Sequence, residues 1–337
     1  MTVDATRPRL KVAYAGVLYD DRVGALFRGD VDVPDVDLTC IAFRDVADLF
    51  RRVATFAEFP VAEMSLATTA RMIGNGDSRF TAVPVFPSRA FRHSQIYIRL
   101  DRGIENPQDL AGKRIGVIEY EMTAALWIRG MLSDDFGVDA QSIDWYTGGW
   151  EQPAKKSRVG HDVEGIPLTR ITDTSLVAML ADGALDAVIG PKAPSAFHER
   201  PDVVGRLFPG YRAVEEDYYR RTRMFPIMHH IVIRREIDEE HPWLATTLAD
   251  AFARSKEVGR RFLLDFDKPA VMHPWIVDDI ERLGEVFGEQ DPFAYGVEPN
   301  RHVLDTALRY CHEQGLTPKQ LSMEDVYART VLDWHES

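Results

Sequence analysis

The sequence predicts an α/β protein with two domains and largely parallel sheets. The chain has 337 residues and 45% hydrophobic content, which is enough to build two cores of ordinary size. In about the first two hundred residues, short apolar runs alternate with segments of helical periodicity, and this is the pattern of strand–helix–strand crossovers. From Pro242 onward the apolar residues recur at helical spacing alone, so a helical C-terminal region is expected.

The first strands are marked by short apolar runs that have the composition of buried strands: residues 10–15, 38–43, 61–66 and 81–86. Between the second and third runs, apolar residues have helical spacing: Val46, Leu49, Phe50 and Val53. Asp45 precedes them and can accept hydrogen bonds from the free N–H groups of the first turn. The sequence therefore predicts a helix over 46–57 that is capped by Asp45.

A second series of elements follows. The predicted strands cover residues 115–118, 143–146, 183–190 (with a preceding turn) and 230–234, and the predicted helices cover 123–132 and 174–181. Residues 151–170 are rich in Lys, Gly and Pro and predict a long loop that is able to act as a flap.

Composition excludes several classes of function. The formal net charge of −13 argues against a nucleic-acid partner, because such proteins present broad basic faces. Cys40 and Cys311 are isolated and form no CxxC pair, so neither a disulfide framework nor a thiolate metal site is indicated. No run of about 18 apolar residues and no signal-like leader is present. We therefore expect a cytoplasmic protein without a membrane partner.

One cationic cluster stands out in this acidic chain. Arg89, Arg92 and His93 lie within a seven-residue stretch that also holds Ser88 and Ser94. Guanidinium groups fit carboxylate and phosphate groups, and histidine moves protons near neutral pH. The cluster favours a small anionic ligand, although a solvated loop would have the same composition.

A series of short motifs, in a fixed order, extends over nearly the whole chain. They are Tyr19-Asp20-Asp21-Arg22, Val61-Ala62-Glu63-Met64-Ser65, residues 84–94, residues 109–117, Thr123-Ala124 with Trp127 and Arg129-Gly130, Gly148-Gly149 with Glu151, residues 176–190, Phe225-Pro226-Ile227-Met228-His229, Tyr295-Gly296 with Asn300-Arg301, and Glu313-Gln314-Gly315-Leu316. Together they resemble the 4,5-dihydroxyphthalate decarboxylase family, an enzyme branch of the type II periplasmic-binding-protein-like folds.

The resemblance implies two lobes, each with a mainly parallel sheet flanked by helices. Lobe one would comprise residues 1–91 plus 229–337, and lobe two residues 92–228. The crossings between them would fall near residues 91–99 and 226–233. A ligand is expected between the lobes, at strand C-terminal ends and helix N-termini, where partial positive charge favours anions.

The resemblance also implies an activity. The expected enzyme is a carboxy-lyase that converts 4,5-dihydroxyphthalate to 3,4-dihydroxybenzoate and carbon dioxide without an organic cofactor, so its partner would be a small anionic aromatic substrate. The alternative is a solute-binding protein that captures an aromatic or organic acid without catalysis, because a fold does not fix a function. Assembly into a homo-oligomer is left open.

Three residues are candidates for proton transfer. His93 and His229 flank the expected crossings and are candidate proton carriers. Hydrogen bonds that fix the hinge are the alternative role of both. Glu63 follows an apolar strand and is a candidate acceptor for a phenol proton, with a salt bridge to an arginine as its alternative role.

The candidate substrate-binding residues are Tyr19, Arg22, Ser65, Arg89, Arg92, Thr123 and Trp127. Among them, Arg89 and Arg92 are candidate carboxylate clamps, although one of the two is expected to form a structural ion pair between the lobes instead. Thr123 begins a predicted helix, where it can meet an anion or act as a plain N-cap. Trp127 either stacks on an aromatic ligand or packs in the core.

A divalent metal is an alternative that the spacing does not favour. Glu63, His93 and His229 form a reasonable N/O ligand set, and a catechol can chelate a metal ion. However, no HxH, HxxxH or HExxH spacing is present. His229 and His230 are adjacent in a predicted strand and would point to opposite faces, so they cannot share one ion.

Overall fold

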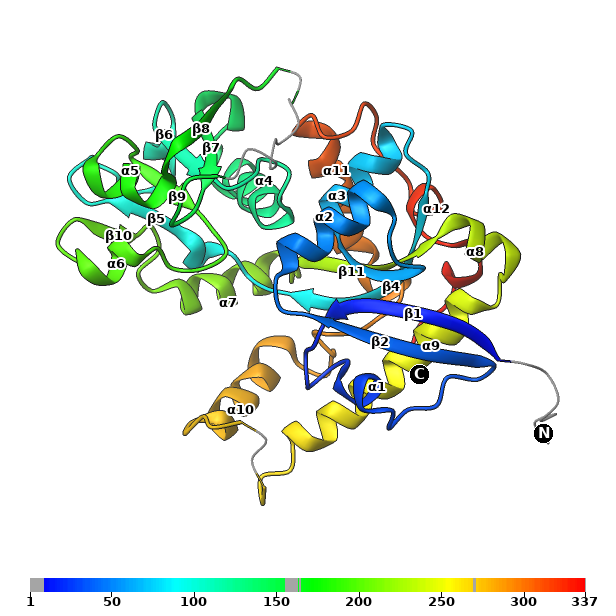
Figure 1. Cartoon of the computed structure of the whole chain (residues 1–337). Coiled ribbons are helices and arrows are strands. Elements are labelled where there is room, and N and C mark those ends of the chain that lie inside the picture. Colours follow the sequence, from blue (N-terminus) through cyan, green and yellow to red (C-terminus); the bar gives the residue numbers. More distant parts are fainter. Residues whose placement is uncertain (1–8, 155–162, 164, 269–270, 337) are drawn as a thin grey trace. The chain divides into compact units, whose positions relative to one another are not determined.

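The structure is a computed structural model that describes residues 9–154, 163, 165–268 and 271–336. It divides into two units, each with its own sheet. Unit 1 consists of Met1–Arg89, His229–Leu304 and Ser322–Ser337, and unit 2 of Ala90–Met228 and Asp305–Leu321 (Figure 1).

Unit 1 contains a five-stranded sheet in the order β2-β1-β3-β11-β4. Its strands are β1 (Leu10–Val17), β2 (Val36–Phe43), β3 (Val61–Ser65), β4 (Phe80–Arg89) and β11 (Ile227–Arg234), the last of which begins in unit 2. Strand β1 pairs in parallel with β2 and β3, whereas β11 runs antiparallel to β3. The four apolar runs expected near the amino terminus are all strands of this sheet.

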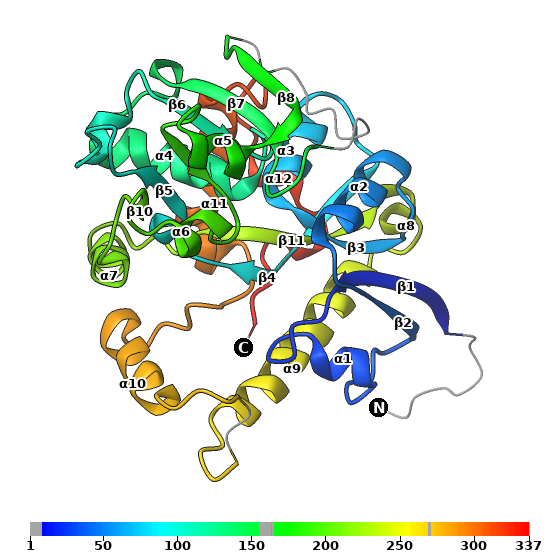
Figure 2. The ribbon, with the colours of Figure 1, turned by 60° about the vertical axis from the view of Figure 1, so that its left-hand side comes forward.

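Helices cover both faces of this sheet, with α1 and α9 on one side and α2 and α3 on the other (Figures 1 and 2). The α-helices with residues in unit 1 are α1 (Gly24–Arg28), α2 (Val46–Phe56), α3 (Leu66–Gly74), α8 (Arg235–Glu240), α9 (Leu244–Leu263), α10 (Ile276–Phe287), α12 (Met323–Val326) and the start of α11 (Arg301–Glu313). Asp45 caps α2 as predicted, because its side chain accepts hydrogen bonds from the N–H groups of Ala47 and Asp48.

Unit 2 contains a six-stranded sheet in the order β10-β5-β9-β6-β7-β8. Its strands are β5 (Ile96–Arg99), β6 (Arg114–Val117), β7 (Asp144–Gly149), β8 (Leu168–Ser175), β9 (Ala187–Ile189) and β10 (Val204–Arg206). Strand β6 pairs in parallel with β7 and β9, and β7 with β8, whereas β5 is antiparallel to β9 and β10. The helices of this unit are α4 (Thr123–Phe136), α5 (Leu176–Asp182), α6 (Ser195–Glu199), α7 (Tyr211–Thr222) and most of α11.

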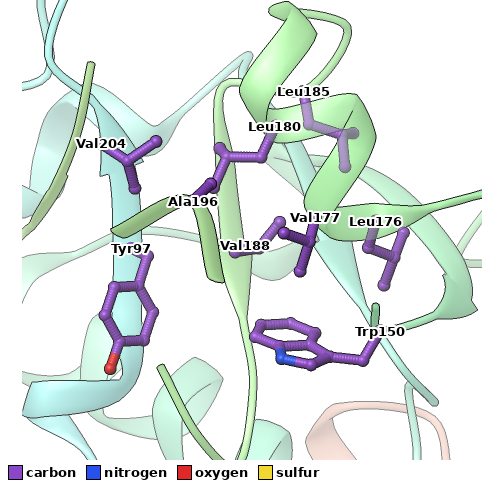
Figure 3. Close-up of a cluster of buried hydrophobic side chains, with 9 residues drawn as sticks. All are labelled: Tyr97, Trp150, Leu176, Val177, Leu180, Leu185, Val188, Ala196 and Val204. Carbon is purple, nitrogen blue, oxygen red and sulfur yellow. The ribbon is translucent and has the colours of Figure 1, made fainter. Parts of the chain in front are cut away.

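One face of this second sheet carries an apolar core. Figure 3 shows Val188 of β9 among Leu176, Val177 and Leu180 of α5, with Trp150 beside them. Gly116 of β6 lies opposite Val188 in the sheet, and a Cβ at Gly116 would lie 2.7 Å from a methyl carbon of Leu185 and 3.1 Å from a methyl carbon of Leu176 in α5. The absence of a side chain at Gly116 therefore lets α5 approach the sheet closely.

Helix α4 packs against α11, with the rings of Trp127 and Tyr310 at a centroid distance of 5.5 Å, and this contact changes one expected boundary. Arg129 of α4 is 1% exposed and donates hydrogen bonds to the side chain of Gln314 (2.7 Å) and to the carbonyl of Tyr120 (2.7 Å). Its guanidinium lies 3.6 Å from the ring centroid of Tyr120, and burial lowers the pKa of Arg129 to about 10. Asp305–Leu321 therefore belongs to unit 2, whereas the sequence placed all of 229–337 in lobe one.

The expected long loop over 151–170 is partly a strand. Strand β8 begins at Leu168 and pairs with β7, and residues 155–162 and 164 lie outside the described residues. Glu151 accepts hydrogen bonds from the N–H and hydroxyl groups of Ser195 at the start of α6. The segment therefore ends in a paired strand, which its polar composition did not indicate.

Short 3-10 helices complete the described chain: His93–Gln95, Pro107–Leu110, Ala140–Ser142, Glu298–Asn300 and Arg329–Val331. In the described part of the chain, no helix combines the length and the apolar character that crossing a membrane requires.

Replacing Gly130 by alanine should destabilise unit 2. An added Cβ would lie 2.2 Å from Cε2 of Tyr310, whose ring is fixed by a hydrogen bond to Asp134 (2.7 Å) and by an edge contact with Trp127. Overpacking costs about 1–3 kcal/mol, and the helix propensity of alanine returns about 1 kcal/mol. We expect a net loss of up to about 2 kcal/mol in the free energy of unfolding, measured by denaturant titration.

Gly284→Ala in α10 is the matched control, because no atom lies within 4 Å of its added Cβ. This variant should keep or raise the stability. Equal effects of the two substitutions would contradict the packing of α4 against α11.

Candidate functional site

The candidate site in unit 1 is built around a buried carboxylate. Glu63 of β3 is 0% exposed and accepts three hydrogen bonds. Its Oε2 accepts from the backbone N–H of Val17 (2.8 Å), and its Oε1 accepts from the hydroxyl of Tyr19 (3.1 Å) and lies 2.6 Å from Nδ1 of His229. A buried charge is tolerated only when it is paired or hydrogen-bonded, so these three groups together allow Glu63 to occupy the core.

Sheet register explains why the three groups meet. Strands β1 and β3 are parallel, with Ala15 opposite Ala62, so Val17 and Glu63 lie at the same edge of the sheet. Strand β11 is antiparallel to β3 and places His229 opposite Ser65, two residues beyond Glu63. Because side chains alternate between the faces of a strand, Glu63 and His229 share a face.

His230 lies on the opposite face, as the strand pattern predicted. It is 0% exposed, its Nδ1 lies 3.4 Å from the hydroxyl of Tyr327, and burial lowers its pKa to about 3. His230 is therefore an uncharged core residue near neutral pH.

His229 connects the buried carboxylate with the surface of unit 1. Its side chain is 15% exposed, whereas that of Glu63 is 0% exposed. The rings of His229 and of Phe50 in α2 pack edge to face, with a centroid distance of 4.8 Å and an interplanar angle of 89°. Nε2 of His229 makes no hydrogen bond to another described residue. The ring is thus fixed at Nδ1, and Nε2 is the nitrogen left for a ligand.

Tyr19 links this pair to the loop after β1. Its hydroxyl donates to Glu63 and also forms a hydrogen bond with the side chain of Ser88. Burial, and then the charge of Glu63, raise the pKa of Tyr19 well above its usual value. The hydroxyl therefore keeps its proton and remains a donor to Glu63 at any physiological pH.

Arg22 is the cation of this loop. It donates to the carbonyl of Pro87 (2.7 Å) and to Asp21 (3.0 Å). Its guanidinium lies 4.9 Å from the ring centroid of Tyr19 and 5.3 Å from that of Phe293. Nη2 of Arg22 donates to no other group in the described part of the chain. The structure thus brings a positioned guanidinium next to the Tyr19–Glu63–His229 network.

Two further predicted residues of unit 1 lie at strand ends. Ser65 ends β3 and caps α3, because its hydroxyl accepts from the N–H (3.4 Å) and hydroxyl (3.1 Å) of Thr68. Arg89 ends β4, is 9% exposed, and holds its guanidinium 5.9 Å from the ring centroid of Phe86. Ser65 has a structural role in the cap; substrate binding by either residue stays a prediction.

His93 belongs to unit 2 and is surrounded by aromatic rings. It is 2% exposed, and its ring packs edge-to-face with Phe208 and Tyr218 at centroid distances of 5.4 and 5.1 Å. Neither ring nitrogen forms a hydrogen bond within the described residues, and Nδ1 lies 3.8 Å from Oε1 of Glu215. Burial lowers the pKa of His93 to about 4 and raises that of Glu215 to about 7. Proton transfer by His93 stays a prediction.

The other three predicted residues of unit 2 have separate surroundings. Arg92 donates to the side-chain oxygen of Gln95 (2.8 Å) and lies 3.1 Å from the sulfur of Met228. Thr123 is buried and begins α4. Trp127 is 1% exposed and donates to the carbonyl of Ile227 (2.9 Å). Trp127 therefore packs in the core, which was the alternative to stacking on a ligand.

The structure offers no ready metal cluster in the residues it describes, where no group of three or more His, Cys, Asp or Glu side chains is arranged to hold an ion. Nδ1 of His229 is committed to Glu63. Of the three ligands considered from the sequence, only Glu63 and His229 lie in the same unit. The use of a divalent metal stays untested.

Several residues of the site gave no signal in the sequence. The N–H of Val17, the ring of Phe50, the hydroxyl of Ser88 and the ring of Phe293 all contact the network or Arg22. Phe50 was part of a predicted apolar helix face, and Ser88 was part of the cationic cluster. Neither could be assigned to the site, because these residues are far from Glu63 or Arg22 in the sequence. Only knowledge of the strand register could have shown that these residues are neighbours.

Comparison with solved structures defines the class of protein. The chain matches the periplasmic aliphatic sulphonate binding protein SsuA from Escherichia coli with a TM-score of 0.53 at 12% identity, over 98% of this chain and 100% of that one. It matches a periplasmic sulfonate-binding protein SsuA from Methylobacillus flagellatus with a TM-score of 0.51 at 12% identity, over 96% and 92% of the two chains. The protein therefore has the predicted type II periplasmic-binding-protein-like fold.

Sequence comparison defines the family. The chain is 38% identical over 315 residues to a 4,5-dihydroxyphthalate decarboxylase from Comamonas testosteroni, which covers 93% of this chain and 95% of the relative. It is 40% identical over 204 residues to a protein of the same name from Pseudomonas putida, over 59% and 78% of the two chains. No family model matches the chain. The chain belongs to the 4,5-dihydroxyphthalate decarboxylase family.

The buried histidine of unit 2 predicts a pH dependence of stability. Below about pH 6.5 the unfolded chain binds a proton that folded His93 refuses until about pH 4. Stability therefore falls as the pH drops through this window, by up to about 1.4 kcal/mol per pH unit. His93→Phe removes this titration, so the stability of the variant relative to the parent should rise as the pH falls from 6.5 to 4.5.

Glu215→Gln is the opposing control, measured by denaturant titration over the same range. Folded Glu215 keeps its proton up to about pH 7, so its contribution to stability is lost as the pH rises. The Gln variant should gain stability relative to the parent between pH 4.5 and 7. A stability difference for His93→Phe that is independent of pH would contradict the buried, uncharged state of His93.

Proposed function

We propose that this protein is a carboxy-lyase that removes one carboxylate of a hydroxylated aromatic dicarboxylate as carbon dioxide, with 4,5-dihydroxyphthalate as the substrate and 3,4-dihydroxybenzoate as the product. The observation that carries the proposal is the 38% identity to a 4,5-dihydroxyphthalate decarboxylase over 93% of the chain. The Glu63–His229 pair supplies a group suited to the proton transfers that this reaction requires.

The reaction can proceed on the substrate's own electrons. Each carboxylate-bearing carbon of 4,5-dihydroxyphthalate has a hydroxyl para to it. Loss of the phenol proton and addition of a proton to the carboxylate-bearing carbon give a dienone. The carbon–carbon bond then breaks, carbon dioxide leaves, and the bonding pair returns to the ring to give a phenolate, which takes up a proton to become the phenol of the product. The balance is one proton consumed per carbon dioxide released, so we propose that no organic cofactor takes part.

His229 is the proposed proton carrier for the ring carbon. A carboxylate only accepts hydrogen bonds, so contact with Glu63 fixes the hydrogen of the neutral ring on Nδ1. A proton taken up at Nε2 is then held on the side away from Glu63. Glu63 stabilises the imidazolium that forms and orients the ring, while transfer from Nε2 places the proton on carbon.

Glu63 itself acts as a positioning residue in this account. The sequence suggested that it accepts the phenol proton, but it is 0% exposed and both of its oxygens are already in hydrogen bonds. A phenol could reach it only after displacing Tyr19 or the N–H of Val17. His229 is therefore the more direct base for the phenol proton. It is also the acid that protonates the ring carbon, because its Nε2 can both accept and donate a proton.

Arg22 is the proposed anchor for the carboxylate that remains on the ring. It is the cation in contact with Tyr19 in unit 1, and its Nη2 is available to a ligand. Tight pairing with the leaving carboxylate would stabilise the ground state instead of the transition state. We therefore assign Arg22 to the carboxylate that stays, and we keep Arg89 and Arg92 as further candidate clamps.

The activity is tested by incubating the purified protein with 4,5-dihydroxyphthalate and measuring carbon dioxide and 3,4-dihydroxybenzoate, with and without a divalent metal. We expect equal amounts of both products without an organic cofactor. Binding of the acid with no turnover under any of these conditions would contradict the proposal and favour a solute-binding role.

Replacing His229 by glutamine should separate proton transfer from substrate binding. Glutamine retains hydrogen-bonding groups but cannot carry a proton at this pH. We expect kcat to fall by roughly two to four decades with little change in KM. His302→Gln, an exposed histidine in the same unit, is the matched control and should leave both parameters unchanged. Normal turnover of His229→Gln would assign the proton to another donor.

Replacing Arg22 by glutamine should discriminate between ligands by their charge. A charge-assisted hydrogen bond contributes about 1.5–3 kcal/mol, so the KM for a dicarboxylate should rise by roughly one to two decades. Binding of catechol, which has the two hydroxyls but no carboxylate for Arg22 to hold, should weaken less. Arg28→Gln is the control, because Arg28 is exposed and pairs with Asp30. Equal losses for both ligands would assign Arg22 to the scaffold.

A further inference from the structure

Two aromatic rings lie against the guanidinium of Arg22, and only one of them belongs to the Glu63 network. The ring centroids of Tyr19 and Phe293 lie 4.9 and 5.3 Å from the guanidinium carbon. A planar guanidinium stacks on aromatic faces, which limits the directions in which its N–H groups can point. Tyr19 is fixed through its hydrogen bond to Glu63. What fixes Phe293 therefore bears on the orientation of Arg22.

The backbone of Phe293 is held on both sides. Its N–H donates to Oδ1 of Asp291 (2.9 Å), and its carbonyl accepts from Nζ of Lys256 in α9 (2.8 Å). Lys256 also donates to Oδ2 of the same Asp291 (2.8 Å). One carboxylate and one ammonium group thus enclose the backbone of Phe293, so its ring cannot move away from Arg22 unless one of these hydrogen bonds breaks.

Lys256 is a buried cation whose three ammonium hydrogens each have an acceptor. It is 8% exposed, and besides Asp291 and the carbonyl of Phe293 it donates to Oε1 of Glu336 (2.6 Å). The same oxygen of Glu336 accepts from the N–H of Tyr295 (2.9 Å). An ammonium group has three donors, and a buried charge must be paired or hydrogen-bonded. Lys256 is therefore committed to the protein and holds residues 291–295 in place.

The same helix supports the other segment that contacts Arg22. Gly259 follows Lys256 by about one turn of α9 and lies on the same face. A Cβ at Gly259 would lie 2.2 Å from the carbonyl oxygen of Asp21, whose side chain accepts from Arg22 (3.0 Å). Figure 1 shows α9 next to α1, the helix that follows this loop. One turn of α9 thus supports the loop of Arg22 directly and Phe293 through Lys256.

We propose that Phe293 and Lys256 are positioning residues of the carboxylate anchor. Lys256 fixes the backbone of Phe293, and the ring of Phe293 holds the guanidinium of Arg22 so that Nη2 is directed at the carboxylate that stays on the substrate. This inference rests on the proposed function, because it takes Arg22 as the group that binds this carboxylate.

Steady-state kinetics with 4,5-dihydroxyphthalate test the role of the ring. Phe293→Leu keeps the backbone and most of the apolar volume but removes the cation–π contact, so KM should rise about three- to tenfold with little change in kcat. Phe293→Tyr keeps the ring and should retain the parent KM. Phe56→Leu is the matched control, because Phe56 is also a phenylalanine of unit 1 near a guanidinium, that of Arg51 at 5.8 Å, but lies outside the site. It should leave both parameters unchanged.

A double variant distinguishes positioning of Arg22 from a general effect on the fold. Arg22→Gln has no guanidinium for Phe293 to hold, so adding Phe293→Leu should raise KM no further. An equal rise in KM in the parent and in the Arg22→Gln background, or no rise in either, would overturn the role of Phe293.

The role of Lys256 needs a variant that leaves no buried charge unpaired. Lys256→Met combined with Asp291→Asn and Glu336→Gln removes all three charges together. This triple variant should raise KM as Phe293→Leu does, and adding Phe293→Leu to it should have little further effect. A triple variant that folds and keeps the parent KM would overturn the role of Lys256.

A spectroscopic measurement separates this inference from the proposed function. A proton next to an aromatic ring has its resonance shifted by the ring current, so the ¹⁵N–¹H signal of Nε of Arg22, assigned with Arg22→Gln, should move in Phe293→Leu and in the triple variant but not in Phe56→Leu. This readout needs no turnover. An inactive parent protein would contradict the proposed function, whereas an Arg22 signal that is the same in the parent, in Phe293→Leu and in the triple variant would overturn the positioning roles even in an active enzyme.

Discussion

The candidate site depends on the buried carboxylate of Glu63 and on its three hydrogen bonds. Because Glu63 is 0% exposed, its charge has no water to solvate it, and the loss of one donor would leave a costly unpaired group. The N–H of Val17, the hydroxyl of Tyr19 and Nδ1 of His229 must therefore stay in place together. One interaction thus fixes the end of β1, the loop after it and the start of β11.

The chemistry of the site depends on the two groups that remain available to a ligand, which are Nε2 of His229 and the guanidinium of Arg22. Glu63 occupies one nitrogen of His229, Phe50 fixes the plane of the ring, and Nε2 remains for a ligand. Arg22 is held beside Tyr19 by Pro87 and Asp21, so a fixed cation accompanies the proton carrier. This combination suits an anionic aromatic acid that must gain a proton on carbon. Preorganised groups of this kind need no rearrangement during the reaction.

The sequence was sufficient for the fold class, the main strands and the Asp45 cap, because these depend on local apolar spacing and on nearby donors. The sequence did not predict that Asp305–Leu321 belongs to unit 2, because the contact of Arg129 with Gln314 joins residues 185 positions apart. The site was predicted in part. Glu63, Tyr19 and His229 were all named, but the pairing of Glu63 with His229 spans 166 positions and depends on the register of β3 with β11. Because of that register, Glu63 is buried, and Glu63 serves to position His229.

The tautomer of His229 is the most direct test of this account. Long-range ¹H–¹⁵N NMR spectra of the ¹⁵N-histidine-labelled protein distinguish a protonated from an unprotonated ring nitrogen, and His229→Gln assigns the signals. We expect the neutral ring of His229 to carry its hydrogen on Nδ1, with Nε2 unprotonated. A neutral ring with its hydrogen on Nε2 would show that Glu63 does not accept a hydrogen bond from His229, and would contradict the assignment of Nε2 as the proton carrier.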